Sequence, residues 1–328
     1  MSDSLLFQTL QFITEKHSFS LNTLKKARED LTKRYQTNRT PGFMGEEERI
    51  AYILARLPAT YAAVGAVLKK LPEKTEIETV LDLGCGPGTA TLACLSEEIG
   101  KNYHLFEQDE KMLALAKECL LMHTPFVTTT QERLEHTENY PTADLVILSY
   151  VLGEIPSEKH KNILQKALDA AQHFLIIISP GTSLLFKDYL AWRDFFIQQG
   201  VMIIAPCPHQ SVCPMQSQEG RWCHFKARVQ RTKELKFLKG GAMSYEDEPY
   251  NYLVIAKKNE NNHHPPQALN RIVSPPIHRK GHSHFELCTF ERTLTPVTLS
   301  AKDDMYKKNK KSEWGDVIES ADVKKEGE

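Results

Sequence analysis

The sequence carries almost no net charge. Its 41 lysine and arginine residues are balanced by 42 aspartate and glutamate residues, which leaves a formal charge of -1 at neutral pH. A chain without an overall positive charge is not drawn as a whole toward nucleic acid, so any such attraction must come from a local patch. We find no internal repeats either.

Signals for a membrane or for export are also lacking. No apolar stretch is expected to be long enough to cross a bilayer. Residues 1–7 contain no basic region, cleavage site or arginine-rich transit pattern. We therefore expect a cytoplasmic protein without a membrane partner, whose seven cysteines are reduced unless they hold metal. The sequence leaves the oligomeric state open.

What is present is the composition of a globular protein with a sizeable core. Of its 328 residues, 41% are hydrophobic and 25% are charged, and this length predicts one large domain or two smaller ones. Residues 1–78 predict an N-terminal helical cap packed on a main sheet. Pro58 is expected to kink or restart a helix there, and Arg56 and Tyr61 could reach a substrate.

Residues 79–89 are the feature around which the chain is organised. An apolar run predicts a buried parallel strand that ends in three glycines at alternate positions. Glycine lets the chain turn sharply and brings its backbone close to a ligand, and the helix predicted over 89–99 would point its first amides at the same ligand. The spacing differs from the G-x-G-x-x-G pattern of nicotinamide cofactor sites. An ordinary glycine-rich turn is the alternative.

The loop resembles the first motif of class I S-adenosylmethionine-dependent methyltransferases, with Asp82, Gly84, Gly86 and Gly88 at the motif positions. In that family the cofactor's amino-acid end lies on this backbone. Glu107 ends the next predicted strand about 20 residues later, where an acidic residue can bind both ribose hydroxyls. A solvated carboxylate is the alternative for Glu107.

Strand and helix patterns alternate over residues 79–258 and predict an α/β fold with a doubly wound parallel sheet of the class I (Rossmann-like) methyltransferase type. Gln131 and Glu132 follow the third strand and could meet an adenine. The fourth strand exits through Ser149–Glu154, where methyltransferases place residues that face the acceptor. That exit does not specify the acceptor atom, and Glu154 is the candidate general base.

Three of the seven cysteines, Cys207, Cys213 and Cys223, fall within a loop at 206–240. Clustered thiols in a reducing compartment are more often metal-binding or catalytic than disulfide-bonded. Zinc could be held by these three with His209 or His224. A four-iron cluster needs a fourth thiolate, and the only later cysteine is Cys288. A loop without metal remains open, whereas Cys85, Cys94 and Cys119 are expected to be small buried thiols.

The segment 221–240 is locally basic. It holds seven lysines and arginines against one acid, Glu234, a net charge of +6, with three aromatic residues between them. This composition is typical of a surface that contacts a phosphate backbone, although a solvated basic helix has it too.

Residues 259–328 differ in composition from the rest and predict a small C-terminal β extension with a basic tail at 307–311. Within it, residues 259–266 predict a polar linker and residues 320–328 a disordered end. The sequence therefore divides into a cap at 1–78, a cofactor-binding domain at 79–258 and this extension.

Motifs along nearly the whole chain resemble those of the methyltransferase-like small-ribosomal-subunit proteins, whose mitochondrial members help assemble the small subunit of the mitochondrial ribosome. The matching stretches are 56–61, 81–88, 149–154, 180–182, 205–209, 213–214, 222–225, 245–248, 287–288 and 314–316. The resemblance implies a class I methyltransferase fold, S-adenosylmethionine binding, and a four-iron four-sulfur (4Fe-4S) cluster on Cys207, Cys213, Cys223 and Cys288.

The resemblance also implies action on small-subunit ribosomal RNA or on small-subunit assembly and translation, with contact through residues 221–240. Mitochondrial members carry a transit peptide, so a cytoplasmic, bacterial relative is expected here. Two alternatives stay open. One is a non-catalytic RNA-binding assembly factor, and the other is a small-molecule methyltransferase with a structural zinc loop.

Overall fold

The computed structural model describes residues 3–37, 42, 45–72, 75–241, 243–257 and 269–319. The chain divides into two compact units, Met1–Ser179 with Ala227–Glu248, and Pro180–Lys226 with Pro249–Glu328. These bounds differ from the three predicted segments. The linker predicted at 259–266 and the disordered end predicted at 320–328 lie outside the described residues.

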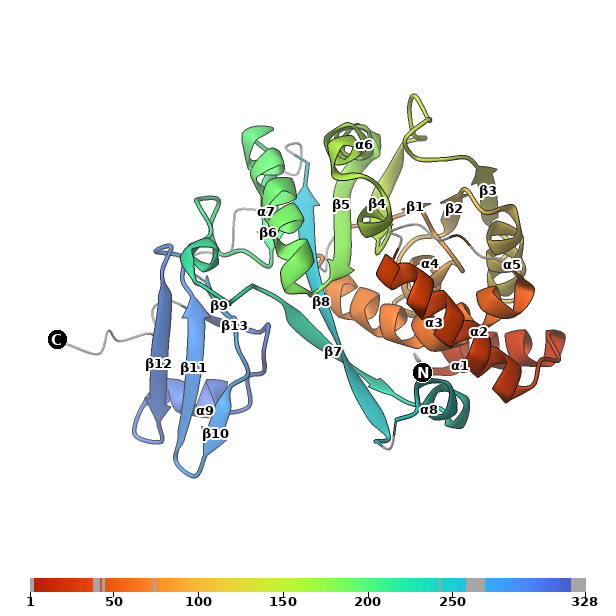
Figure 1. The fold of residues 1–328 in the computed structure, drawn as a ribbon. Helices are drawn as coiled ribbons and strands as arrows, with labels where there is room; N and C mark the ends of the chain where they lie inside the picture. The colour runs from red at the N-terminus through yellow and green to blue at the C-terminus, as the bar shows by residue number, and fades with distance from the viewer. Residues whose placement is uncertain are drawn as a thin grey trace. The chain divides into compact units, whose positions relative to one another are not determined.

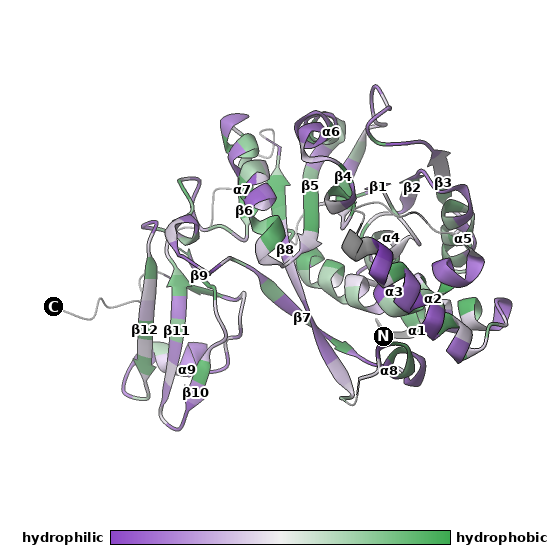
Figure 2. Cartoon of the chain, viewed as in Figure 1, coloured by the Kyte–Doolittle hydropathy of each residue, from purple (hydrophilic) through white to green (hydrophobic). Residues whose placement is uncertain are grey.

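The first unit is built on parallel strands β1 (Thr79–Leu83), β2 (Asn102–Glu107), β3 (Val127–Gln131), β4 (Ala143–Ser149) and β5 (Ala171–Pro180). They lie in the order β3-β2-β1-β4-β5, and every pair is parallel (Figure 1). Leu145 to Leu148 are fully buried, and Figure 2 shows β4 and β5 as mainly apolar. This order is that of a doubly wound sheet, so the predicted α/β fold is confirmed.

Helices occupy the N-terminal part of the unit and the connections between its strands. They are α1 (Asp3–Lys16), α2 (Leu21–Thr37), α3 (Glu46–Leu68), α4 (Thr89–Ser96), α5 (Glu110–Leu121), η1 (Leu152–Glu154) and α6 (Ser157–Ala170). α3 packs against both α2 and α4. The Asp109 side chain caps α5 by accepting a hydrogen bond from the Met112 amide at 2.8 Å. α3 continues through Pro58 as a single helix, because its flanking residues are buried on the core.

α3 corrects the expectation that no apolar stretch could cross a bilayer. Of the helices in the described residues, it alone is long and apolar enough for a membrane span, at 23 residues. Its most apolar window is 67% buried inside the protein, as in the core helix of a globular fold. Length and composition are therefore weak evidence for a membrane here.

The predicted basic segment folds as strand β7 (Phe225–Gln230) and helix α8 (Lys233–Lys239), and not as one basic helix. β7 alternates between buried and exposed side chains and pairs with β8 (Tyr245–Ala256). Thr232 caps the start of α8, and Gly240 ends it at φ +66°. α8 packs against α2 and α3 in the first unit.

The second unit contains α7 (Ser183–Gln198), β6 (Met202–Ala205), η2 (Pro214–Ser217) and a separate small sheet. β6 pairs antiparallel with β8. The small sheet has the order β10-β11-β9-β13, with β12 paired to β11. Its elements are β9 (Leu269–Ile272), β10 (Ile277–Arg279), β11 (His282–Cys288), β12 (Leu294–Ser300), α9 (Asp304–Asn309) and β13 (Val317–Glu319). Its core is Ile272, Phe285, Leu287, Val297, Leu299 and Ile318.

Candidate functional site

A cavity of about 400 Å³ opens in the first unit at the carboxyl ends of β1, β2 and β4. The strand order reverses between β1 and β4, and ligands of doubly wound sheets bind at such a point. The wall is formed by the glycine loop, the end of β2, residues 132–135, the exit of β4 and one face of α3. This volume suits a nucleoside-sized ligand.

The three glycines of the predicted motif differ in what surrounds them. Gly84 has φ +69°, and a Cβ there would lie 2.4 Å from Cγ2 of Val151, so this glycine lets the loop pack on the β4 exit. Gly86 has φ +53° and lines the cavity, and a Cβ there would meet no atom within 4 Å. The backbone of Gly86 is thus the part of the loop that a ligand could approach. Gly88 is not among the lining residues.

Glu107 lies at the cavity where β2 ends. Its Oε2 accepts a hydrogen bond from the Gly86 amide at 3.0 Å, and its Oε1 accepts from the amides of Gln108 and Asp109 at 2.8 and 3.0 Å. Burial raises the pKa of Glu107, and these hydrogen bonds oppose the rise. A carboxylate offers about four lone-pair sites, so one remains for a ribose hydroxyl beside the three amides.

Asp82 is placed differently from its prediction as a cofactor-binding residue. Its Oδ2 accepts hydrogen bonds from the Thr91 amide and hydroxyl at 3.2 and 2.9 Å, and it is not among the residues that line the cavity. Burial raises the pKa of Asp82 to about 6. The sequence predicts a hydrogen-bond acceptor for the cofactor at the end of β1. In the structure the Asp82 carboxylate instead accepts hydrogen bonds from Thr91 and so fixes the first turn of α4.

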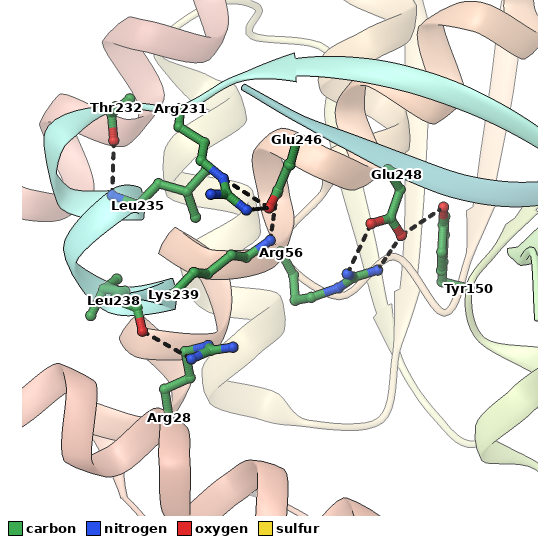
Figure 3. A network of polar contacts seen from close by, with 10 residues as sticks. All are labelled: Arg28, Arg56, Tyr150, Arg231, Thr232, Leu235, Leu238, Lys239, Glu246 and Glu248. Atoms are coloured by element: carbon green, nitrogen blue, oxygen red, sulfur yellow. Dashed lines mark hydrogen bonds and ion pairs between the residues drawn. The ribbon is translucent and has the colours of Figure 1, made fainter. Parts of the chain in front are cut away.

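A polar network lies beside the cavity (Figure 3). Of its members, only Arg56 was singled out from the sequence as a residue that could reach a substrate. Arg56 donates from Nη2 and Nη1 to the two oxygens of Glu248 at 2.8 and 3.3 Å. The hydroxyl of Tyr150 donates to the same carboxylate at 3.3 Å, and the Arg56 guanidinium lies 5.5 Å from the centre of the Tyr150 ring. Tyr150 adopts φ +61°, a conformation that costs energy for a residue other than glycine.

Arg56 and Tyr150 line the cavity, so this network shapes its wall. Arg56 was expected to reach a substrate, whereas Tyr61, its companion in that prediction, is buried and does not line the cavity. Glu248 comes from β8, 192 positions after Arg56. The acidic stretch 245–248 was the only signal that could have pointed to it.

Glu154, the candidate base, also lines the cavity, and so does Tyr52 of α3. Burial raises the pKa of Tyr52, and the nearby negative charge of Glu154 adds to the rise. Tyr52 was not predicted as a site residue. Of the two residues expected near an adenine, Glu132 lines the cavity and Gln131 does not.

Most cations of the basic segment are paired with acids that the local charge count omitted. Arg231 and Lys239 both contact Glu246, at 2.8 and 2.5 Å. Arg228 contacts Asp247 at 2.8 Å, and Arg221 contacts Glu286 at 2.5 Å. Counting to residue 248 adds three acids, so seven cations face four acids and the net charge falls from +6 to +3. Within the described residues, no ion pair is found for Lys233 or Lys236, which lie on α8.

The second unit places four cysteines around one small cavity. This cavity, of about 20 Å³, is lined by Cys207, Cys213, Cys223 and Cys288, together with Arg193, His209 and Arg271. Cys288 ends β11, while the other three belong to the loop between β6 and β7. Burial raises the pKa values of Cys213, Cys223 and Cys288.

Neither of the predicted metal sites, for zinc or for a four-iron cluster, is preformed in the described residues. In the part of the chain that the structure describes, no three His, Cys, Asp or Glu side chains are arranged to hold a metal ion. The Nδ1 atom of His209 accepts a hydrogen bond from the Ser211 amide at 3.2 Å, and burial lowers the His209 pKa to about 4. Nδ1 of His224 lies 3.1 Å from the Trp222 carbonyl, and His224 does not line the cavity. Neither histidine is placed as a fourth ligand.

Comparison with known proteins finds a family match over most of the chain. The family described as "Mitochondrial small ribosomal subunit Rsm22" matches residues 46–319. Two mitochondrial Rsm22-cox11 tandem proteins of Schizosaccharomyces pombe are each 26% identical over 84% of this chain. The match covers 43% of each, so this chain spans less than half the length of these relatives.

Two further similarities involve proteins named for S-adenosylmethionine chemistry. A carboxy-S-adenosyl-L-methionine synthase of Shewanella amazonensis is 28% identical over 36% of this chain and 47% of its own length. The structure of magnesium protoporphyrin IX methyltransferase from Synechocystis PCC 6803 covers 72% of this chain and 100% of its own, at 15% identity and a TM-score of 0.41. The fold assignment rests on the strand order described above.

Proposed function

Because the chain belongs to the family described as mitochondrial small ribosomal subunit Rsm22, we propose that it is an S-adenosylmethionine-binding, methyltransferase-like protein that acts on the small ribosomal subunit. The cofactor would occupy the cavity at the ends of β1, β2 and β4. The observation that carries this proposal is the open space beside Gly86, next to a carboxylate at the end of β2. A cofactor on this loop would lie against backbone amides, with a ribose hydroxyl on Glu107.

The methyl group would be transferred to a nucleophile that enters between α3 and the exit of β4. Bound S-adenosylmethionine supplies an electrophilic methyl group on its sulfonium. The chain's own contribution is to position the acceptor in line with that group, which is where such a site gains most of its rate. Tyr52, Arg56, Tyr150 and Glu154 form the wall on this side. Glu154 is the residue proposed to accept the acceptor's proton.

Replacing Glu107 by alanine tests the cofactor assignment. The change removes a charged acceptor, and hydrogen bonds to charged groups contribute about 1.5–3 kcal/mol, so S-adenosylmethionine should bind about 10- to 100-fold more weakly in calorimetry. Glu110→Ala is the matched control, since Glu110 is an exposed acid three positions later that does not line the cavity. If Glu107→Ala binds S-adenosylmethionine as tightly as the parent does, the assignment of the cofactor to this cavity is wrong.

We further propose that Cys207, Cys213, Cys223 and Cys288 hold a four-iron four-sulfur cluster. Four thiols around one cavity fit the donor set of such a cluster. When bound, the group would supply a redox-active iron centre and a link between the loop and β11.

Contact with small-subunit ribosomal RNA is proposed through α8, with a smaller charge than the sequence indicated. Lys233 and Lys236 are its cations without a described ion pair. Arg231 and Lys239 share the single negative charge of Glu246, so together they offer one net positive charge to a phosphate and not two. A cytoplasmic location remains a prediction from the sequence.

The double variant Lys233→Gln/Lys236→Gln tests this contact. Losing two phosphate contacts should weaken binding to ribosomal RNA and reduce the slope of log affinity against log salt by about 0.7–0.9 for each contact. The matched control is Lys159→Gln/Lys161→Gln, which removes two exposed lysines from α6. An unchanged slope in the α8 variant, or an equal change in the α6 control, would contradict RNA contact at α8.

A further inference from the structure

The cysteine cavity contains two buried cations. Arg193 of α7 is 0% exposed, and Arg271 of β9 is 8% exposed. Arg271 donates to two neutral acceptors, the carbonyls of Pro206 and Gly315, at 2.8 and 2.7 Å. A buried charge is costly unless an opposite charge accompanies it. Both arginines therefore favour negative charge at the thiols that they adjoin.

Arg193 is directed at one of the thiols. Its Nε donates to Sγ of Cys207 at 3.3 Å, and its Nη2 donates to the carbonyls of His209 and Ser211 at 3.0 and 2.6 Å. Asp194, the nearby carboxylate, is half exposed and lies 3.5 Å from Nη1. The guanidinium thus fixes the loop around His209 and presents an N–H group to a sulfur.

His209 adjoins a second cysteine of the cavity, Cys288. Because its Nδ1 accepts the Ser211 amide, the ring hydrogen of the neutral imidazole is on Nε2. Nε2 lies 3.8 Å from Sγ of Cys288, within reach of an N–H···S hydrogen bond. In this tautomer neither ring nitrogen is available to bind metal. His209 is therefore placed to donate a hydrogen bond to the sulfur of Cys288 and not to bind a metal.

We propose that Arg193 and His209 are positioning residues that set the reduction potential of the cluster, by donating N–H groups to the thiolates of Cys207 and Cys288. The inference rests on the cluster assigned under the proposed function. Hydrogen bonds to cluster sulfurs stabilise the more negative, reduced form and therefore raise the potential. The two donors act on different thiolates, Arg193 on Cys207 of the loop and His209 on Cys288 of β11.

The test compares anaerobically purified parent, His209→Leu and His209→Gln by redox titration of the full chain. His209→Leu removes the donor, so the ratio of reduced to oxidised cluster at a fixed potential should fall about tenfold, equivalent to about 59 mV for a one-electron couple. Gln carries an N–H donor and should restore part of the shift. His224→Leu is the matched control, because His224 lies outside the cavity and should leave the potential unchanged.

An unchanged potential in His209→Leu, with the cluster retained, overturns the proposal. If His209→Leu loses its cluster on purification, the cluster is rebuilt anaerobically with iron and sulfide in all variants, and the rate of iron loss to a chelator decides instead. Slower loss from His209→Gln than from His209→Leu supports the donor role, and equal loss overturns it. A colourless parent without iron overturns the cluster itself. Release of a zinc ion by His209→Leu would identify His209 as a ligand and overturn the donor role.

Discussion

Cys288→Ser is expected to abolish the brown colour and the iron content of anaerobically purified protein. Cys288 lies 65 positions after Cys223, yet both line the same cavity. A cluster on four thiolates would tie the loop between β6 and β7 to β11 of the small sheet. Serine offers an oxygen in place of a strong thiolate ligand, so the cluster should be lost and not merely weakened.

Loss of the cluster should also loosen the second unit. A group that binds only the folded protein raises its free energy of unfolding, and removal of the group lowers that free energy again. Residues 269–300 should then be cut faster by protease. The small sheet has few large core side chains of its own, which makes this region sensitive to the loss of a cross-link.

The matched control is Cys119→Ser. Cys119 is 1% exposed in α5 of the first unit and does not line the cysteine cavity. This variant should keep the parent's iron and sulfide, in equal amounts, even if it is less stable. A colourless parent that carries one zinc ion and keeps it in Cys288→Ser would refute the iron–sulfur assignment.

The parallel sheet could be predicted because its strands are short local runs, apolar in β1, β4 and β5 and β-branched in β3. β1 and β4 are buried on both faces, and the helices between strands have regular apolar spacing. The glycine loop and Glu107 were found for the same reason, since the strand ends place them at one edge of the sheet. Their chemistry follows from local pattern.

The partners of these residues could not be predicted in the same way. Glu248 reaches Arg56 only because β8 returns to α3, and Tyr150 takes a positive φ that no residue-type preference suggests. The charge of the basic segment was overestimated because its count ended at residue 240, before the acids at 246–248 that lower the net charge from +6 to +3. Pairing across long separations is decided by topology, which a local window does not contain.

The second large effect is expected at Gly84, and it should differ in kind from the effect at Gly86. In Gly84→Ala the new Cβ would lie 2.4 Å from Cγ2 and 2.8 Å from Cβ of Val151, at φ +69°. Overpacking costs about 1–3 kcal/mol and the left-handed backbone about 1–2 kcal/mol, so unfolding should become easier by about 2–5 kcal/mol. Chemical denaturation measures this loss.

Gly86→Ala should lose less stability than Gly84→Ala but should lose affinity for the cofactor. Its φ is +53° with no atom within 4 Å of the new Cβ, so the stability cost is about 1–2 kcal/mol from the backbone alone. The methyl group would occupy the space proposed for the cofactor, and calorimetry should find S-adenosylmethionine binding at least about tenfold weaker, a change of about 1.4 kcal/mol. Gly220→Ala controls for backbone strain, since Gly220 has φ +68°, open space around it and no place in the cavity. If Gly86→Ala binds the cofactor as tightly as Gly220→Ala does, the cofactor does not lie on this loop.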